Sequence, residues 1–177
     1  MVVEFIDGEM KIYDNPNAVL TNAPELPWHL ENLRNYVNLS AYMKEAEING
    51  ITYKGMGFGS GYVGIPGDGT PPSRFVRITL LREFSNPVET EEEGVMLALH
   101  LLNTVDIPAG VSKREGSGPA AFENTQWVTI KDNKNLKLYF RSYDCSSLFR
   151  CRKVDFSNGT ECKPIIGDKE FSVTDAY

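Results

Sequence analysis

The sequence is short of positive charge and has no long apolar run. Lysine and arginine number 18 against 24 acidic residues, which gives a net charge of -6 and an isoelectric point near 5.0. Phosphate binding needs a clustered positive surface, so this balance argues against a nucleic-acid partner. No apolar run approaches the roughly 20 residues that cross a bilayer, and the opening MVVEFIDGEM has neither the basic start nor the apolar core of a signal peptide. We expect no membrane partner, and the compartment stays open.

Cysteine and histidine, the residues of most metal sites, are also scarce. The three cysteines are Cys145, Cys151 and Cys162, and their spacing matches no zinc site of the Cys-x-x-Cys type. An odd number excludes complete internal pairing, and free thiols are favoured. The only histidines, His29 and His100, lie far apart in apolar stretches typical of helices, so each is expected to be a packed or half-exposed helical residue. We expect neither a metal nor a cofactor.

The remaining composition supports one folded domain. Of 177 residues, 41% are hydrophobic and 24% charged, which is ordinary for a globular protein with a real core. No repeat or linker divides residues 1–177. Asp7-Gly8 between two short apolar runs predicts a hairpin of residues 2–6 and 10–13, and a third strand is expected at 18–21.

Helical spacing is clearest in two places. Leu26, Leu30, Leu33 and Val37 recur every three or four residues, which predicts a helix from residue 26 with Pro27 in its first turn. TEEE at 90–93 has the spacing of a capping box and predicts a helix through residue 103.

The rest of the chain favours strands. Residues 126–131 and 136–143 alternate well enough to be paired strands, and a last strand is expected at 152–156. This order of strands and helices predicts an α+β fold with antiparallel sheets and flanking helices.

Seven of the 15 glycines lie between residues 53 and 77, in YKGMGFGSGYVGIPGDGTPPSRFVR. Such a loop resembles a phosphate cradle, but no Gly-Lys-Ser/Thr follows, and Pro66, Pro71 and Pro72 argue against the helix that a bound phosphate requires. We therefore interpret the segment as a long loop. Residues 75–84 are apolar and β-branched enough to favour a strand, with a buried helix as the alternative.

Local motifs of other hydrolases are missing. Gly59-Ser60-Gly61 lacks the spacing of a serine nucleophile elbow, no cysteine stands in suggestive context with a histidine, and the acidic residues are scattered.

Four blocks in order carry a more specific signal. They are DNPNAVLTNAPELPWHLENLRNYVNLS at 14–40, the glycine-rich segment ending GIPGDGTPPSRFVR at 55–77, LNTVDIP at 102–108 and LYFRSYD at 138–144. Together they closely resemble the choloylglycine hydrolase family, which contains bile salt hydrolases and penicillin V acylases. The resemblance runs through nearly the whole chain and corresponds to roughly the C-terminal half of a typical member.

The resemblance implies an αββα sandwich of the N-terminal nucleophile hydrolase type, here incomplete. It also implies hydrolysis of linear amide bonds in small N-acyl amides such as conjugated bile salts or penicillin V. The family's nucleophile is a cysteine at the mature N-terminus, and no cysteine precedes Cys145 here. We expect the chain alone to be inactive, and to pair with the missing N-terminal half or to self-associate through open sheet edges. The alternative is a non-catalytic binding or structural protein that keeps the wall of the acyl pocket.

Two site residues follow from the resemblance. Asn22, in VLTNAP, matches the asparagine that holds the developing oxyanion or the substrate amide, although Ala23 replaces the family's usual serine. Arg74, in PSRFVR, matches the arginine beside the nucleophile, where its permanent charge favours a thiolate. Arg77 is the alternative if the register differs.

Overall fold

The computed structural model describes residues 1–116 and 122–152. These residues form two compact units. The first contains Met1–Pro87 with Asn103–Val105, and the second contains Val88–Leu102 and the chain from Asp106 on. The expectation that residues 1–177 form one domain stays a prediction. No helix in the described ranges is both long and apolar enough to cross a bilayer.

The first unit opens with the hairpin that the sequence predicts. Strands β1 (Val2–Ile6) and β2 (Glu9–Tyr13) pair antiparallel around Asp7-Gly8. Both turn residues have positive φ, 52° and 82°, as a two-residue turn of this kind requires. The predicted hairpin is confirmed.

The expected strand at 18–21 is wrong. Ala18 adopts a positive φ of 49°, which interrupts an extended chain. The turn is held locally, because Ala18 N donates to Asn15 O over 3.2 Å and Asn15 Nδ2 donates to Val19 O over 3.0 Å. These local hydrogen bonds replace the ladder that a strand needs.

The predicted helix from residue 26 is confirmed, with a tighter end. Helix α1 (Leu26–Asn32) continues as the 3₁₀ turn η1 (Leu33–Tyr36), and Pro27 lies in the first turn of α1. Leu26 is fully buried in a core with Val2, Val19 and Phe75. Leu26 N donates to Glu4 Oε2 over 3.0 Å, which joins the start of α1 to β1.

The strand favoured at 75–84 is wrong, and so is the argument that prolines exclude a helix after the glycine loop. Residues 71–84 form the helix α2 (Pro71–Phe84), as the alternative had it, with Pro71 and Pro72 in its first turn. A first-turn proline loses nothing, because its missing N–H would have no partner within the helix. Burial of Phe75 and Val76, and packing of Ile78 against the core, explain the apolar residues of this run.

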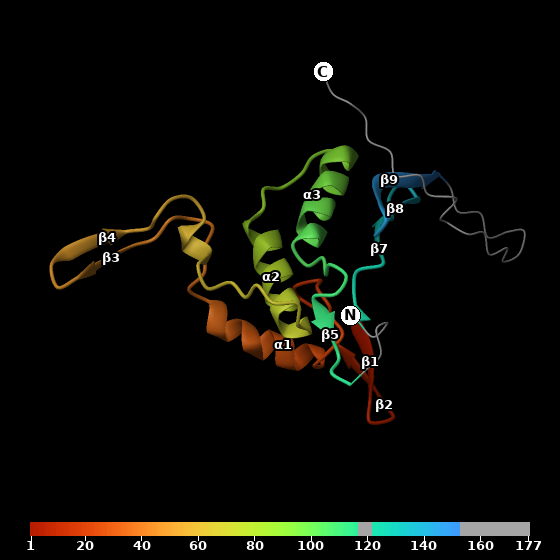
Figure 1. Cartoon of the computed structure of the whole chain (residues 1–177), viewed down its shortest axis with the longest axis horizontal. Coiled ribbons are helices and arrows are strands. Elements are labelled where there is room, and N and C mark those ends of the chain that lie inside the picture. Colours follow the sequence, from red (N-terminus) through yellow and green to blue (C-terminus); the bar gives the residue numbers. More distant parts are fainter. Residues whose placement is uncertain (117–121, 153–177) are drawn as a thin grey trace, which may run out of the picture. The chain divides into compact units, whose positions relative to one another are not determined.

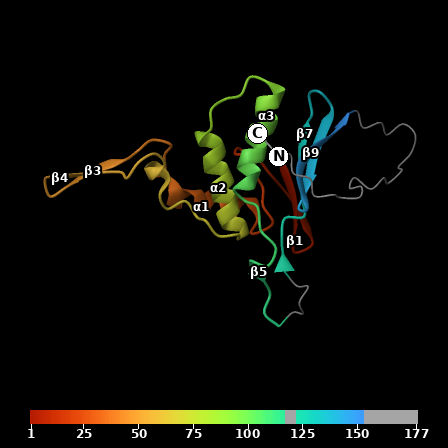
Figure 2. The same cartoon turned by 45° about the horizontal axis from the view of Figure 1, so that its top comes forward.

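A second hairpin was not predicted. Strands β3 (Glu45–Ile48) and β4 (Ile51–Lys54) turn at Asn49-Gly50, a strong hairpin signal, and every residue of both strands is exposed. The hairpin projects from the rest of the first unit in two views (Figures 1 and 2). The glycine-rich chain that follows is a loop with the short 3₁₀ turn η2 (Ser60–Tyr62), as expected. A Cβ on Gly61 would lie 1.8 Å from Tyr42 O, so this position admits no side chain.

The second unit contains the best-predicted elements. Helix α3 (Glu91–Asn103) begins with the predicted capping box: Glu93 N donates to Thr90 Oγ1 over 3.2 Å, and Thr90 N donates to Glu93 Oε2 over 3.0 Å. Strands β7 (Trp127–Asp132), β8 (Lys137–Ser142) and β9 (Cys145–Arg152) form an antiparallel sheet in that order.

The predicted pair of strands at 126–131 and 136–143 is therefore confirmed. Most of β9 was missed, and the strand expected at 152–156 lies outside the described residues beyond Arg152. Strands β5 (Ser112–Lys113) and β6 (Phe122–Glu123) form a minor pair.

The start of α3 is fixed to this sheet by a carboxylate. Glu91 Oε2 lies 2.5 Å from Lys137 Nζ, and Tyr139 OH donates to Glu91 Oε1. Both contacts come from β8. The sheet that contains it lies beside α3 in Figure 2, where β7 and β9 are labelled. The bonds with Lys137 and Tyr139 lower the pKa of Glu91, so the carboxylate stays charged.

Substitution of Leu26 by alanine tests the core of the first unit. A fully buried leucine leaves a cavity when truncated, so Leu26→Ala is expected to lower the free energy of unfolding by about 2–5 kcal/mol. Urea titration followed by circular dichroism measures this change. Leu20→Ala is the matched control, since Leu20 is 51% exposed, and a loss equal to that of Leu26→Ala would contradict the assignment of this core.

Candidate active site

Two side chains that are 52 residues apart in sequence meet in the first unit. Arg74 Nη2 donates to Asn22 Oδ1 over 2.7 Å. The two residues predicted from the family blocks therefore lie in direct contact. Asn22 is exposed and Arg74 is half-buried, so the pair is open to a ligand.

The hydrogen bond fixes the orientation of the Asn22 amide. An arginine only donates, so the amide oxygen faces Arg74 and the Nδ2 group is turned away from it. Within the described residues, no hydrogen bond to Asn22 Nδ2 is found, which leaves its donors for another group. A permanent cation beside a free neutral donor suits an anion that develops during a reaction.

Arg74 is placed by the start of α2. It lies in the first turn of the helix, where its N–H donates to Thr70 O over 2.9 Å, and its side-chain Nε donates to Gly69 O over 3.1 Å. The glycine-rich loop thus supplies a backbone carbonyl that orients the guanidinium.

A carboxylate organises the same helix start. Asp68 Oδ2 accepts from Ser73 Oγ over 2.6 Å, and Asp68 Oδ1 accepts from the Thr70 N–H over 2.9 Å and from the Thr70 hydroxyl. These bonds, from Ser73 and then Thr70, lower the pKa of Asp68 to about 2. The sequence had not singled out Asp68, although an aspartate two residues before a helix cap is a recognisable turn signal.

Arg77, the alternative to Arg74, has a different environment. It is buried, and its Nη1 donates to Pro66 O over 2.6 Å and to Asp68 O over 3.3 Å. Burial lowers its pKa. Arg77 thus holds the loop against α2, and the structure does not bring it to Asn22.

Asn22 lies in a short irregular segment beside α1. The Ala23-Pro24 peptide bond that follows it is cis. Thr21, just before it, bonds through its hydroxyl to Nε2 of the buried His29 over 3.0 Å. The expectation that His29 packs inside a helix is confirmed, but its contact with Thr21 was not foreseen, because nothing in local spacing signals it.

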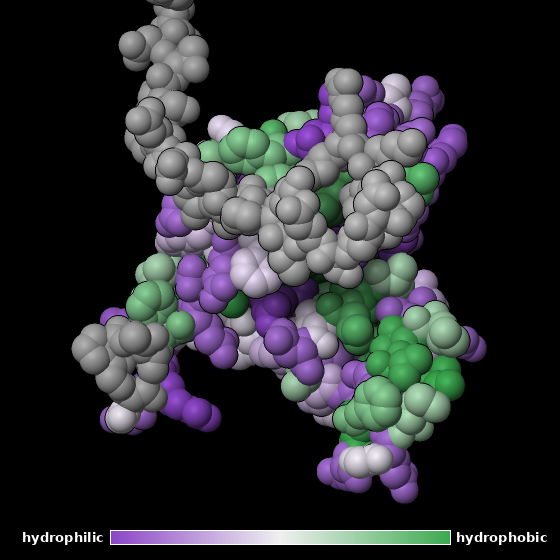
Figure 3. Space-filling view, turned by 90° about the vertical axis from the view of Figure 1, so that its right-hand side faces the viewer, coloured by the Kyte–Doolittle hydropathy of each residue, from purple (hydrophilic) through white to green (hydrophobic). Residues whose placement is uncertain are grey.

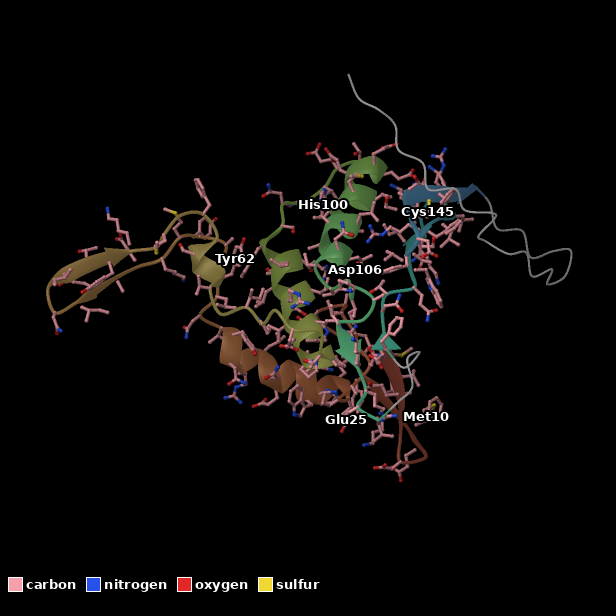
Figure 4. All side chains as sticks on the ribbon, in the orientation of Figure 1. Met10, Glu25, Tyr62, His100, Asp106 and Cys145 are labelled. Atoms are coloured by element: carbon pink, nitrogen blue, oxygen red, sulfur yellow. The ribbon has the colours of Figure 1, made fainter. Side chains whose placement is uncertain are left out.

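The other predicted residues of interest lie in the second unit. His100 is exposed on α3, and Cys145, a free half-buried thiol, starts β9; both are labelled in Figure 4. Among the described residues, no group of three potential metal ligands is found.

Comparison with known proteins identifies the family. The model of the linear amide C–N hydrolases, choloylglycine hydrolase family, matches residues 1–159. The chain therefore belongs to the choloylglycine hydrolase family. The bile salt hydrolase/transferase of Bifidobacterium longum is 34% identical over 157 residues, which cover 88% of this chain and 49% of that protein.

Other relatives agree. The bile salt hydrolase/transferase of Clostridium perfringens is 34% identical over 114 residues, 64% of this chain and 35% of its own length. A crystal structure of a mutant conjugated bile acid hydrolase from the same species superimposes with a TM-score of 0.71 at 28% identity, covering 85% of this chain and 45% of that one. This chain thus spans about half the length, or less, of the relatives it matches.

These likenesses also confirm the fold class. The α+β arrangement of antiparallel sheets and helices is that of the N-terminal nucleophile hydrolases to which the bile acid hydrolase belongs.

Asp68 gives the first unit a defined acid sensitivity. Its carboxyl has a lower pKa in the folded state, about 2, than its ordinary 3.8, so its contribution to stability is present above pH 3.8 and is lost as the pH falls through 2. We expect Asp68→Asn to reduce stability at pH 6 by about 1 kcal/mol or less, because the carboxylate is exposed, and to reduce it little at pH 2.

Urea unfolding at both values and a ¹³C titration of the carboxyl groups measure this effect. Asp14→Asn removes another exposed carboxylate and serves as the control. Titration of the Asp68 carboxyl at its ordinary pKa would contradict the structure.

Proposed function

We propose that this chain supplies part of the active site of an enzyme that hydrolyses linear N-acyl amides, such as conjugated bile salts or penicillin V. The bond between Arg74 and Asn22 is the observation that carries the proposal, because it joins a cation to an oriented amide donor. Family membership supports the same reaction class.

The nucleophile comes from outside the 177 residues. The cysteines stand at positions 145, 151 and 162, and Cys145 starts a strand whose backbone pairs with Ser142. A nucleophile that must be freed at an N-terminus has no place inside such a sheet. We propose that a further segment, carrying an N-terminal cysteine, completes the site.

In the completed site each group has a task. The α-amino group of the cysteine takes the thiol proton, and the charge of Arg74 favours the thiolate. The thiolate attacks the amide carbon, and Asn22 Nδ2 donates to the oxygen that becomes negative. The C–N bond breaks, the amine leaves with the proton, and water then hydrolyses the thioester to the acid and the free thiol.

Complementation tests this proposal. The chain is mixed with, or fused to, a family segment that carries the N-terminal cysteine, and release of amine from a bile salt conjugate or of acid from penicillin V is measured. We expect activity only in the mixture or fusion. In it, Asn22→Ala lowers kcat/KM by about 10²–10³-fold, as loss of an oxyanion donor does, and Arg74→Ala has a similar effect.

Arg34→Ala and Asn35→Ala are the matched controls. Both residues are outside the pair, and Arg34 contacts Glu31 at the surface. Unfolding curves of all variants separate a lost reaction from a lost fold. A complex that forms without any activity would favour the alternative, a non-catalytic binding or structural protein.

The partner surface is proposed from an uncovered apolar sheet face. Val3 pairs with Ile12 and Phe5 pairs with Met10, and all four side chains lie on one face of the β1–β2 hairpin. They are 44–72% exposed. Figure 3 shows one face of the molecule, with a green, hydrophobic patch low on it. We propose that the completing segment covers this face and that, without it, a second copy does so.

Sedimentation tests the self-association of this chain alone. We expect concentration-dependent association at micromolar concentrations, and Phe5→Lys is expected to weaken it at least about tenfold by placing a charge in the apolar face. Glu9→Gln changes the net charge equally on the other face of the hairpin and serves as the control. A chain that stays monomeric at all concentrations would contradict the proposal.

A further inference from the structure

One buried side chain touches both segments that carry the Asn22–Arg74 pair. His29, on α1, has no exposed surface. Its Nε2 lies 3.0 Å from Thr21 Oγ1, and its ring stacks on Phe75 with centroids 4.5 Å apart and planes 14° apart. Thr21 is the residue before Asn22, and Phe75 is the residue after Arg74.

These two contacts differ in kind. The hydrogen bond to Thr21 is directional and fixes a segment that has no strand partner, since residues 18–21 form no strand. The stacked ring fixes Phe75, and with it the rotation of the first turns of α2. The imidazole therefore contacts the sequence neighbour of each member of the Asn22–Arg74 pair.

We propose that His29 is a positioning residue for the site, which holds Asn22 in hydrogen-bonding register with Arg74 through its separate contacts with Thr21 and Phe75. This inference rests on the proposed roles of Asn22 and Arg74 for its meaning in catalysis. The effect of His29 on the positions of Asn22 and Arg74 concerns this chain alone and can be tested without any substrate.

The protonation state is consistent with this role. Burial lowers the pKa of His29, so the ring is neutral near pH 7. A neutral imidazole has one donor and one acceptor nitrogen, and it stacks on Phe75 without the cost of a buried charge.

Two substitutions separate the two contacts. His29→Phe keeps a ring against Phe75 and loses the bond to Thr21, whereas His29→Gln keeps a polar group near Thr21 and loses the ring. In ¹⁵N-labelled chain, we expect His29→Phe to shift the side-chain amide signals of Asn22 and leave the Arg74 Nε–H signal nearly in place. His29→Gln is expected to shift the Arg74 Nε–H signal and, because Arg74 Nη2 donates to Asn22 Oδ1, the Asn22 amide signals with it.

A double-mutant cycle sharpens the test. Thr21→Val removes the same hydrogen bond from its other end, so it should reproduce the Asn22 shift, and the double variant Thr21→Val with His29→Phe should add nothing further. Leu26→Ala is the control for a general packing defect, because Leu26 is fully buried on the same helix. If neither His29 variant moves the Asn22 signals, or if His29→Phe also moves the Arg74 signal as Leu26→Ala does, the proposal is overturned.

Activity of the completed enzyme links the inference to function. There His29→Phe is expected to lower kcat about 10-fold to 100-fold with little change in KM, as misplacement of a catalytic group does. Full activity of Asn22→Ala and Arg74→Ala would refute the proposed function but leave the NMR difference between the two His29 variants intact. Loss of that difference would refute the role of His29 whatever the activity of the other variants.

Discussion

The burial of Phe75 is the constraint on which the first unit depends. Its ring has no exposed surface and packs with Leu26, Val2 and Val19, which come from three separate segments. Neighbouring residues of a helix project about 100° apart. Burying Phe75 therefore fixes the rotation of α2 and directs Arg74 to the edge of the core, where it meets Asn22. The packing of the core and the placement of the Asn22–Arg74 pair therefore depend on the same residue, Phe75.

The helix start that resembled a phosphate site already holds an anion. The carboxylate of Asp68 accepts hydrogen bonds from the Thr70 N–H and the Ser73 hydroxyl at the start of α2. The hydrogen-bond donors at the start of α2 are thus bonded by Asp68 of the same chain, and these bonds fix the conformation of the loop before the helix. Pro71 and Pro72 are compatible with this helix, so the argument that they exclude it was wrong, but they also remove two of the N–H groups that a phosphate would bind.

Local sequence signals predicted much of the fold, but features that depend on residues distant in sequence were not predicted. Asp7-Gly8 and the Thr90–Glu93 capping box each depend on residues within four positions, and both were correct. The run at 75–84 was misread because a buried helix and a buried strand have the same apolar composition. Asn49-Gly50 is a hairpin signal that was missed, because residues 53–77 beside it were interpreted as one long glycine-rich loop.

In the candidate site, too, contacts between residues distant in sequence could not be predicted from local patterns. Asn22 and Arg74 came from the resemblance to family blocks, and no local pattern predicts a contact across 52 residues. The contact of His29 with Thr21 has no signal in the local sequence, whereas Asp68, two residues before the cap of α2, had a turn signal that was not used. Residues 18–21 lack the ladder of a strand, so side-chain contacts from Asn15, Val19 and Thr21 must place the next residue. A leucine in place of His29 would fill the same space but leave the Thr21 hydroxyl without a partner. The hydrogen bond from the His29 ring therefore orients residues 18–21, which apolar packing alone would bury without fixing their orientation.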